Sequence, residues 1–287
     1  MTIRKILVPL AGSVSDGTPL ATALLAATRF RAHVVGVHVR ADSRDVAPLA
    51  GEGLSGAMIE EMMSAADRKG VERSDAVRAM FGRVVAEHGI RIVLPVPGQD
   101  EPTASFAAPV GREEDLVARL ARLADLTVVS HPATAGGPSS DALHAVLFDS
   151  GRPVLIAPKA CPRAIGTRVC VAWNGTAEAS AAIMGLMPWF NGVRAVQVLH
   201  ASEYQRRGPP ACDVIDYLAL HGVRADLVPF RPVNREVGAG LLAAALEFGA
   251  DLLCMGAYSH SRLRQLVLGG VTRHVLEHAS LPVLMSR

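Results

Sequence analysis

One order of elements occurs twice along the chain, and this internal repeat limits the folds that the sequence can adopt. Short apolar runs alternate with helical stretches in each half, a pattern typical of a parallel α/β sheet. In the first half, strands are predicted at residues 6–10, 33–39, 92–96, 126–129 and 154–156, with helices at 20–30, 55–88, 114–122 and 141–148. In the second half, strands are predicted at 169–172, 195–199, 225–230, 252–255 and 282–285, with helices at 177–186, 212–221, 236–248 and 263–278. A repeat longer than about 100 residues indicates a duplicated domain rather than a solenoid.

Short pieces of sequence also match between the two halves. Residues 6–13 and 169–176 each run from an apolar strand into a glycine followed by serine or threonine. Ala-Asp-Leu opens the fourth strand of both halves, and Pro-Val-Leu lies in both last strands. The stretch 158–167 contains two prolines and a glycine, which suits a linker. The predicted domains are therefore residues 1–160 and 167–287.

Composition excludes several classes of protein. The 29 basic and 27 acidic residues give a formal charge of +2, so no surface specialised for nucleic acid is predicted. None of the lysines stands in Gly-Lys-Ser or Gly-Lys-Thr, which excludes a P-loop. No apolar run approaches the ~18 residues of a membrane span, and the start has no long apolar core of a signal peptide. We therefore expect a cytoplasmic protein with no membrane partner.

The strongest candidate for a binding site follows the fourth strand of the second half. Its first part is Met255-Gly256-Ala257-Tyr258-Ser259-His260-Ser261-Arg262, and its second part is Leu268-Gly269-Gly270-Val271-Thr272 at the start of a helix. A glycine at the end of a strand lets the backbone pass close to a ligand. Amide groups at a helix start favour phosphate, and Arg262 would add a cation. The same spacing also suits a helix-capping turn that binds nothing.

These features resemble the universal stress protein family. The resemblance rests on two tandem copies of one α/β unit, with Gly-x-x-(Gly)-x9-Gly-(Ser)-x-Thr in the last loop. It implies an adenine nucleotide alpha hydrolase-like fold, with five parallel strands in the order 3-2-1-4-5 in each copy and helices on both faces. It also implies ATP or AMP, with Mg²⁺, whose adenine lies near the first two strands and whose phosphates lie in the glycine loop.

Carried over by position, the resemblance implies a nucleotide site in the second copy. Gly256, Gly269 and Thr272 match the family motif, with Val271 between the last two. Ser259 replaces the expected second glycine, and Gly270 replaces an expected serine or threonine. His260 and Arg262 lie in the same loop. The remaining implied members of the site are Ala172, Trp173, Asn174, Val198 and Met255.

The end of the first strand distinguishes the two copies. In nucleotide-binding members of the family, an aspartate there meets the ribose hydroxyls. The second copy has Asn174, which can still hydrogen-bond a hydroxyl, whereas the first copy has Ala11, which cannot. The last loop of the first copy, residues 130–141, is also shorter and has no Gly-x-x-Gly. A nucleotide is therefore predicted in the second copy alone, where Trp173 could either stack on a base or lie in the core.

Two other functions remain open at this point. A water near His260 could allow slow ATP hydrolysis, or neither copy binds nucleotide and the chain is a scaffold. No catalytic residue is predicted. No metal site is predicted either, because His274 and His278 share a helix face without an evident third ligand. Edge strands need covering, so we expect the copies to pack as a pseudo-dimer through residues 153–155 and 282–284. A dimer of two chains is implied by the resemblance only.

Overall fold

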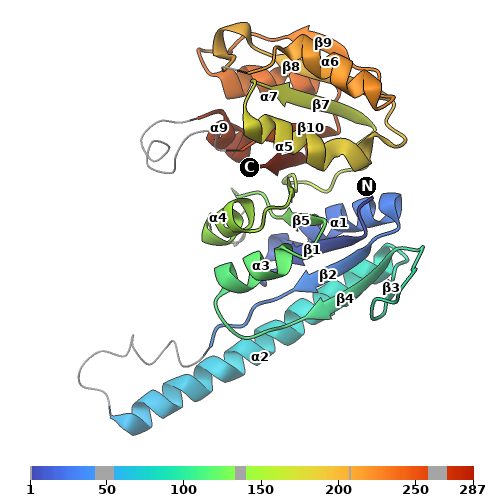
Figure 1. Cartoon of the computed structure of the whole chain (residues 1–287). Helices are drawn as coiled ribbons and strands as arrows, with labels where there is room; N and C mark the ends of the chain where they lie inside the picture. The colour runs from blue at the N-terminus through green and yellow to red at the C-terminus, as the bar shows by residue number, and fades with distance from the viewer. Residues whose placement is uncertain (1, 43–54, 133–139, 207, 258–269) are drawn as a thin grey trace.

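A single sheet of eleven strands runs through both halves of the protein (Figure 1). The computed structural model describes residues 2–42, 55–132, 140–206, 208–257 and 270–287. The strands are β1 (Lys5–Pro9), β2 (His33–Val37), β3 (Arg91–Ile92), β4 (Thr103–Ala107), β5 (Leu126–Val129), β6 (Val154–Ile156), β7 (Arg168–Trp173), β8 (Ala195–His200), β9 (Asp226–Pro229), β10 (Leu252–Gly256) and β11 (Val283–Ser286). Their order across the sheet is β3-β4-β2-β1-β5-β6-β11-β10-β7-β8-β9.

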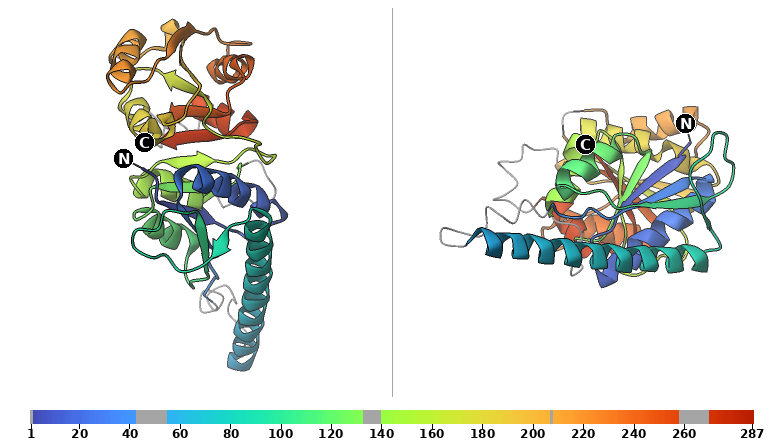
Figure 2. Two further views of the ribbon diagram at one scale, coloured as in Figure 1. Left: turned by 90° about the vertical axis from the view of Figure 1, so that its right-hand side faces the viewer. Right: turned by 90° about the horizontal axis from the view of Figure 1, so that it is seen from below.

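Helices cover both faces of this sheet (Figure 2). They are α1 (Gly17–Phe30), α2 (Gly56–Glu87), α3 (Glu113–Ala121), α4 (Ser140–Asp149), α5 (Ala177–Leu186), α6 (Ala211–Leu220), α7 (Val237–Phe248) and α9 (Val271–His278). Side chains of α1, α2, α5 and α6 share one hydrophobic core, and those of α3, α4, α7 and α9 share the other. Each core continues across both halves. Successive strand residues alternate between the two cores, which is why the strands read as unbroken apolar runs.

The second half has the predicted strand order. From the centre of the sheet outwards it reads β11-β10-β7-β8-β9, which is 5-4-1-2-3 in units of that half. All of its neighbouring strands are parallel. The helix predicted at 177–186 has those bounds as α5, and the helix predicted at 236–248 is α7.

The first half corrects one prediction. The strand expected at 92–96 is wrong: β3 is only Arg91–Ile92, and β4, which was not predicted, pairs with β2 over five residues. Pro95 and Pro97 explain the early end of β3, because proline has no N–H to donate to a ladder. The chain therefore pairs a later, small-residue segment with β2, and β3 is left at the outer edge of the sheet.

The two halves meet through β6 and β11, the strands whose packing was predicted. These are the antiparallel pair in an otherwise parallel sheet, with Leu155 opposite Leu284 at the centre of three paired residues. An antiparallel pair of equivalent strands relates the two halves by a local two-fold axis. A second contact between the halves joins α1 to the turn that follows α5. Arg29 of α1 donates to the carbonyl oxygens of Trp189 and Asn191, both at 2.7 Å.

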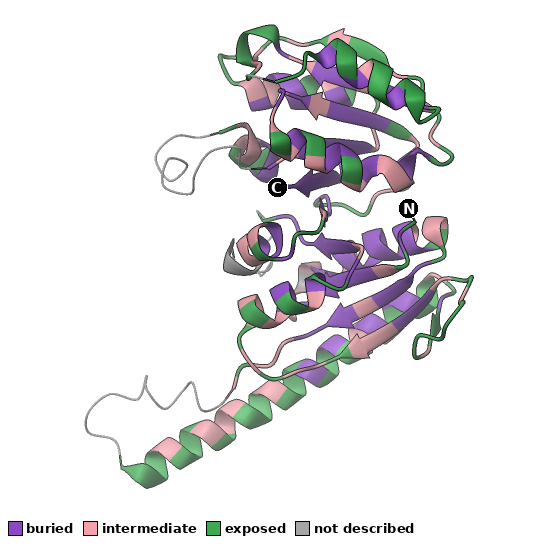
Figure 3. Cartoon of the chain, in the orientation of Figure 1, coloured by how far each residue is buried: buried purple, intermediate pink, exposed green. Residues whose placement is uncertain are grey.

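The long helix α2 is only partly covered (Figure 3). Its buried residues are Ser74, Val77, Phe81, Val84 and Val85, all in the C-terminal half of the helix. The N-terminal half extends past the sheet with an exposed surface. Within the described ranges, no helix is long and apolar enough to cross a bilayer.

Two buried histidines make the stability of the fold depend on pH. His33 lies 2.7 Å from Thr103 Oγ1 and 2.8 Å from Ser105 Oγ, and burial together with Lys5 lowers its pKa. Burial together with Lys159 likewise lowers the pKa of His131. As pH falls below about 6.5, the unfolded chain takes up protons that the folded chain does not.

We therefore expect the free energy of unfolding to decrease between about pH 7 and pH 5. Urea denaturation of wild type at several pH values measures this slope. The variant His33→Gln should lose part of the slope, whereas His221→Gln, on the surface, serves as the control. An unchanged slope in His33→Gln would contradict the assignment.

Candidate nucleotide site

The turn after β7 forms one wall of the predicted site. Asn174 Oδ1 accepts hydrogen bonds from the backbone N–H of Thr176 at 3.3 Å and from its hydroxyl at 3.0 Å. Thr176 in turn caps α5 by accepting from Ala179 N at 3.3 Å. Gly175 stands between them at φ +82°, a left-handed conformation that favours glycine. The turn therefore uses the oxygen of Asn174 internally, which leaves the side-chain nitrogen as the group able to donate to a ligand.

Gly256 ends β10 beside this turn, and the structure supplies a reason for glycine that sequence reasoning missed. A β-carbon added there would lie 2.5 Å from Ala179 N and 2.6 Å from the carbonyl carbon of Glu178. The first turn of α5 therefore packs directly on Gly256. Close packing of the helix, independent of any ligand, already requires the absence of a side chain at this position.

The start of α9 contributes a second part of the predicted site. Gly270 is the N-cap residue, it is exposed, and no heavy atom of the described residues lies within 4 Å of where its β-carbon would be. Glycine has no side chain with which to accept from the first amides of the helix, and an anion can take that place at a helix start. Val271 packs against the core at its edge, and Thr272 is half-buried next to it. Ser259, His260, Arg262 and Gly269 lie outside the described residues.

The other predicted members of the site lie deeper. Val198 is fully buried and Met255 is 5% exposed, each within a hydrophobic core. Ala172 is half-buried. The side chain of Val198 therefore contacts the core under α5 and α6, so that only backbone atoms at this position could meet a ligand.

Gln205, Arg206, Gly208 and Pro209 pack on the turn after β7 and on the end of this strand. The N–H of Arg206 donates to the carbonyl of Asn174 at 2.8 Å, and Gly208 packs so closely on Gly175 O that a β-carbon would collide with it. Trp173 is 7% exposed, and its indole N–H donates to Pro209 O at 2.9 Å. The structure thus places Trp173 as a core residue tied to this segment.

The equivalent edge of the first half is filled by side chains of the protein itself. Asp16, which is fully buried, accepts from Gly12 N at 2.7 Å and from Ser13 N at 3.2 Å. Arg73 of α2 donates to Ala11 O at 2.6 Å, and a β-carbon on Gly12 would lie 2.5 Å from Arg73 Nε. The amides that could meet a ligand are therefore already bonded.

An acidic environment adds to this blockage. Burial, then the nearby carboxylates of Glu114 and Asp16, raise the pKa of Glu113, against the opposing effect of Arg73. Such a cluster of carboxyl groups opposes the binding of a phosphate. The Ser-x-x-Asp sequence at 13–16 is a helix-capping signal, so the role of Asp16 could have been predicted from the sequence. The contact of Arg73 with this turn could not have been predicted in that way.

The architecture defines a class: an α/β protein with helices on both faces of a mostly parallel sheet. The universal stress protein from Archaeoglobus fulgidus DSM 4304 is similar over 100% of this chain and 97% of its own, with a TM-score of 0.70 and 15% identity. A functionally unknown protein from Pseudomonas aeruginosa PAO1 is similar over 99% of this chain and 92% of its own, with a TM-score of 0.56 and 16% identity.

Sequence comparison matches part of the chain to one family. The family model of the universal stress protein family matches residues 196–287. A segment of 37 residues is 57% identical to the universal stress protein Slr1230 of Synechocystis, and this segment is 13% of either chain. Residues 196–287 therefore resemble the universal stress protein family in sequence, and the chain as a whole shares the fold of a universal stress protein.

Proposed function

We propose that this chain is a universal stress protein that serves a stress response by binding one adenine nucleotide, ATP or AMP, in its second half. The observation that supports this assignment is the difference between the two strand-end turns. In the first half, Asp16 and Arg73 occupy the turn after β1. In the second half, Asn174 retains a donor, and the N-cap residue of α9 is Gly270, which has no side chain to cap the helix.

Each group has a defined part in this proposal. The side-chain nitrogen of Asn174 donates to a ribose hydroxyl, in place of the aspartate that accepts from it in the family. The amides after Gly270 donate to phosphate oxygens, which the helix dipole of α9 also attracts. Among the described residues, no group of three or more potential metal ligands occurs. Mg²⁺ would therefore be held mainly by the phosphates and water, as is usual for this ion.

Gly270→Val tests the site directly. Because no atom of the described residues lies near the β-carbon position of Gly270, we expect valine to fit, but its branched side chain shields the first amides of α9. We expect roughly tenfold weaker binding of ATP or more, which corresponds to about 1.4 kcal/mol. Isothermal titration calorimetry measures both the affinity and the stoichiometry, and the wild type should bind one nucleotide per chain.

Gly56→Val is the matched control. Gly56 is also an exposed glycine at a helix start, with no atom of the described part of the chain near its β-carbon position, but it lies in the first half. This variant should bind ATP as the wild type does. A stoichiometry of two, or equal losses in both variants, would contradict the assignment to the second half. An absence of binding at millimolar ATP would favour the scaffold alternative.

A further inference from the structure

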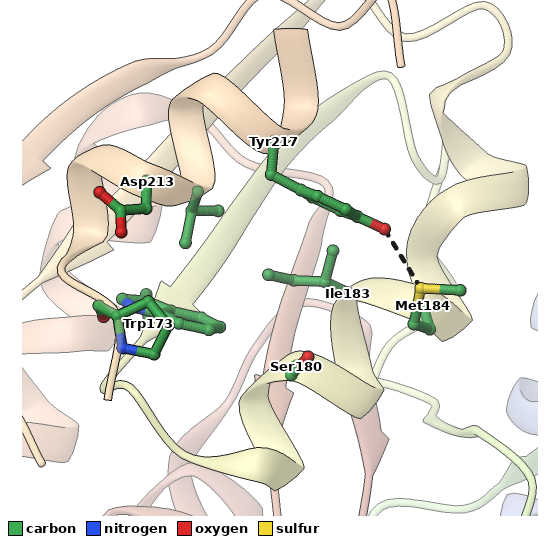
Figure 4. A pocket seen from close by; sticks show the side chains of 8 residues that line it. Trp173, Ser180, Ile183, Met184, Asp213 and Tyr217 are labelled. Carbon is green, nitrogen blue, oxygen red and sulfur yellow. Dashed lines mark hydrogen bonds between the residues drawn. The ribbon is translucent and has the colours of Figure 1, made fainter. Parts of the chain in front are cut away.

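A cavity of about 290 Å³ opens between α5 and α6, on the face of the sheet that these helices cover (Figure 4). Its walls include Trp173 at the end of β7, Ile183 and Met184 of α5, and Val214 and Tyr217 of α6. The volume is at the lower end of the range for small-molecule sites, enough for a ligand with about one ring. The nucleotide site proposed above uses none of the α6 residues.

The walls of this cavity are held in place from two sides. Trp173 is fixed by the hydrogen bond from its indole N–H to Pro209 O at 2.9 Å. Across the opening, the hydroxyl of Tyr217 donates to the sulfur of Met184 at 3.3 Å. Ile183 and Val214 are each 4% exposed and form the apolar floor. Met184 and Tyr217 are 50% and 37% exposed, so they form a rim that a ligand can reach.

One charged group borders this apolar space. Asp213, in the first turn of α6, lines the cavity next to Trp173 (Figure 4). Its described hydrogen-bond partner is the weak donor Cys212 Sγ, at 3.5 Å. Among the described residues, no arginine or lysine lines the cavity, and none of the ion pairs includes Asp213. The carboxylate is thus an acceptor whose charge is not balanced by a neighbour in the described part of the chain.

We propose that this cavity binds a small organic cation, a protonated amine carried on an aromatic or aliphatic body. The ammonium group pairs with Asp213, and the apolar body lies between Trp173, Ile183 and Tyr217. Aromatic rings next to a carboxylate suit a cation, because the ring faces carry partial negative charge. The same carboxylate repels phosphates and carboxylates, so the cavity selects against a nucleotide. This proposal is independent of nucleotide binding.

The test compares two probes of similar shape and opposite charge. 2-Phenylethylamine is a cation at neutral pH, and 3-phenylpropionate is an anion. We expect the amine to bind, with a change in tryptophan fluorescence because Trp173 lines the cavity, while the anion produces no change. Calorimetry of the full chain, up to roughly 10 mM probe, gives the affinity.

Three variants locate the binding. Asp213→Asn should weaken the amine roughly fivefold, the upper end for an ion pair near the surface. Asp216→Asn is the matched control, because Asp216 is an exposed carboxylate of the same helix that does not line the cavity. Ser180→Phe, at an exposed lining position of α5, should fill the space and abolish binding without disturbing the core.

Several outcomes would overturn the proposal. They are equal binding of the two probes, no binding of the amine at the highest concentration, and an equal loss in Asp213→Asn and Asp216→Asn. Competition between the amine and AMP would show instead that the cavity is part of a nucleotide site. Because the amine titration is read without nucleotide, its failure is distinguishable from a failure of ATP binding.

Discussion

Replacing Trp189 with alanine is expected to lower the free energy of unfolding by about 3–5 kcal/mol, as for other buried tryptophans. Trp189 lies in the 3₁₀ turn Met187–Phe190 of the second half and is fully buried. Its ring packs edge-on against Phe30 of the first half, with centroids 4.8 Å apart. Gly166 of the linker packs so tightly on this ring that a β-carbon would lie 2.6 Å from it. Alanine would leave a cavity where the first half, the linker and the second half meet.

Guanidinium denaturation followed by circular dichroism measures the loss. Trp189→Phe should cost less than Trp189→Ala, because phenylalanine retains a ring and the indole N–H has no hydrogen-bond partner among the described residues. Leu220→Ala, at a residue that is 86% exposed, should change stability by no more than about 0.5 kcal/mol. If Trp189→Ala were as mild as Leu220→Ala, the two halves would not share this contact.

Leu155 and Leu284 are expected to show strong energetic coupling across the centre of the sheet. Both side chains are fully buried and lie directly opposite each other in the antiparallel pair of β6 and β11. Each single change to alanine should cost about 2–5 kcal/mol, from lost burial and the cavity left behind. Because the two side chains meet, the double variant should depart from additivity by roughly 0.5–3 kcal/mol.

A second pair provides the control for this double-mutant cycle. Leu218 of α6 is also fully buried, but it lies near β8 and β9, away from the joining strands. The effects of Leu155→Ala and Leu218→Ala should add within about 0.5 kcal/mol. Additivity of Leu155→Ala and Leu284→Ala would be incompatible with the pairing of β6 and β11.

Local patterns predicted most of the elements. The helix predicted at 55–88 is α2, Gly56–Glu87, and the strands at 126–129 and 154–156 have those bounds in the structure. These predictions succeed because apolar periodicity and turn residues act over a few positions along the chain. The error at 92–96 has the same origin. Its apolar residues suggest a buried strand, yet Ile92 is 52% exposed and Leu94 is 80% exposed.

The candidate site was less accessible to sequence reasoning. The sequence suggested that Gly256 makes room for a ligand. In the structure, the backbone of the first turn of α5 occupies the space where a side chain of residue 256 would lie. Trp173 allowed two interpretations, and the structure adds that its indole N–H donates to Pro209, 36 positions away. Such contacts depend on how a distant loop crosses the end of a strand. No local pattern encodes that path.

The sequence by itself determined the repeated α/β order, the two-sided burial of the strands, and the strand edges through which the halves join. Each of these follows from the apolar character of neighbouring residues, which must leave water wherever the chain folds. Only the tertiary structure decided which strand lies beside β2, that Arg73 reaches Ala11 across 62 positions, and that Asp213 borders a cavity beneath α6. These contacts depend on the lengths and directions of side chains from separate elements. Close packing determines them, and it acts only once the elements have come together.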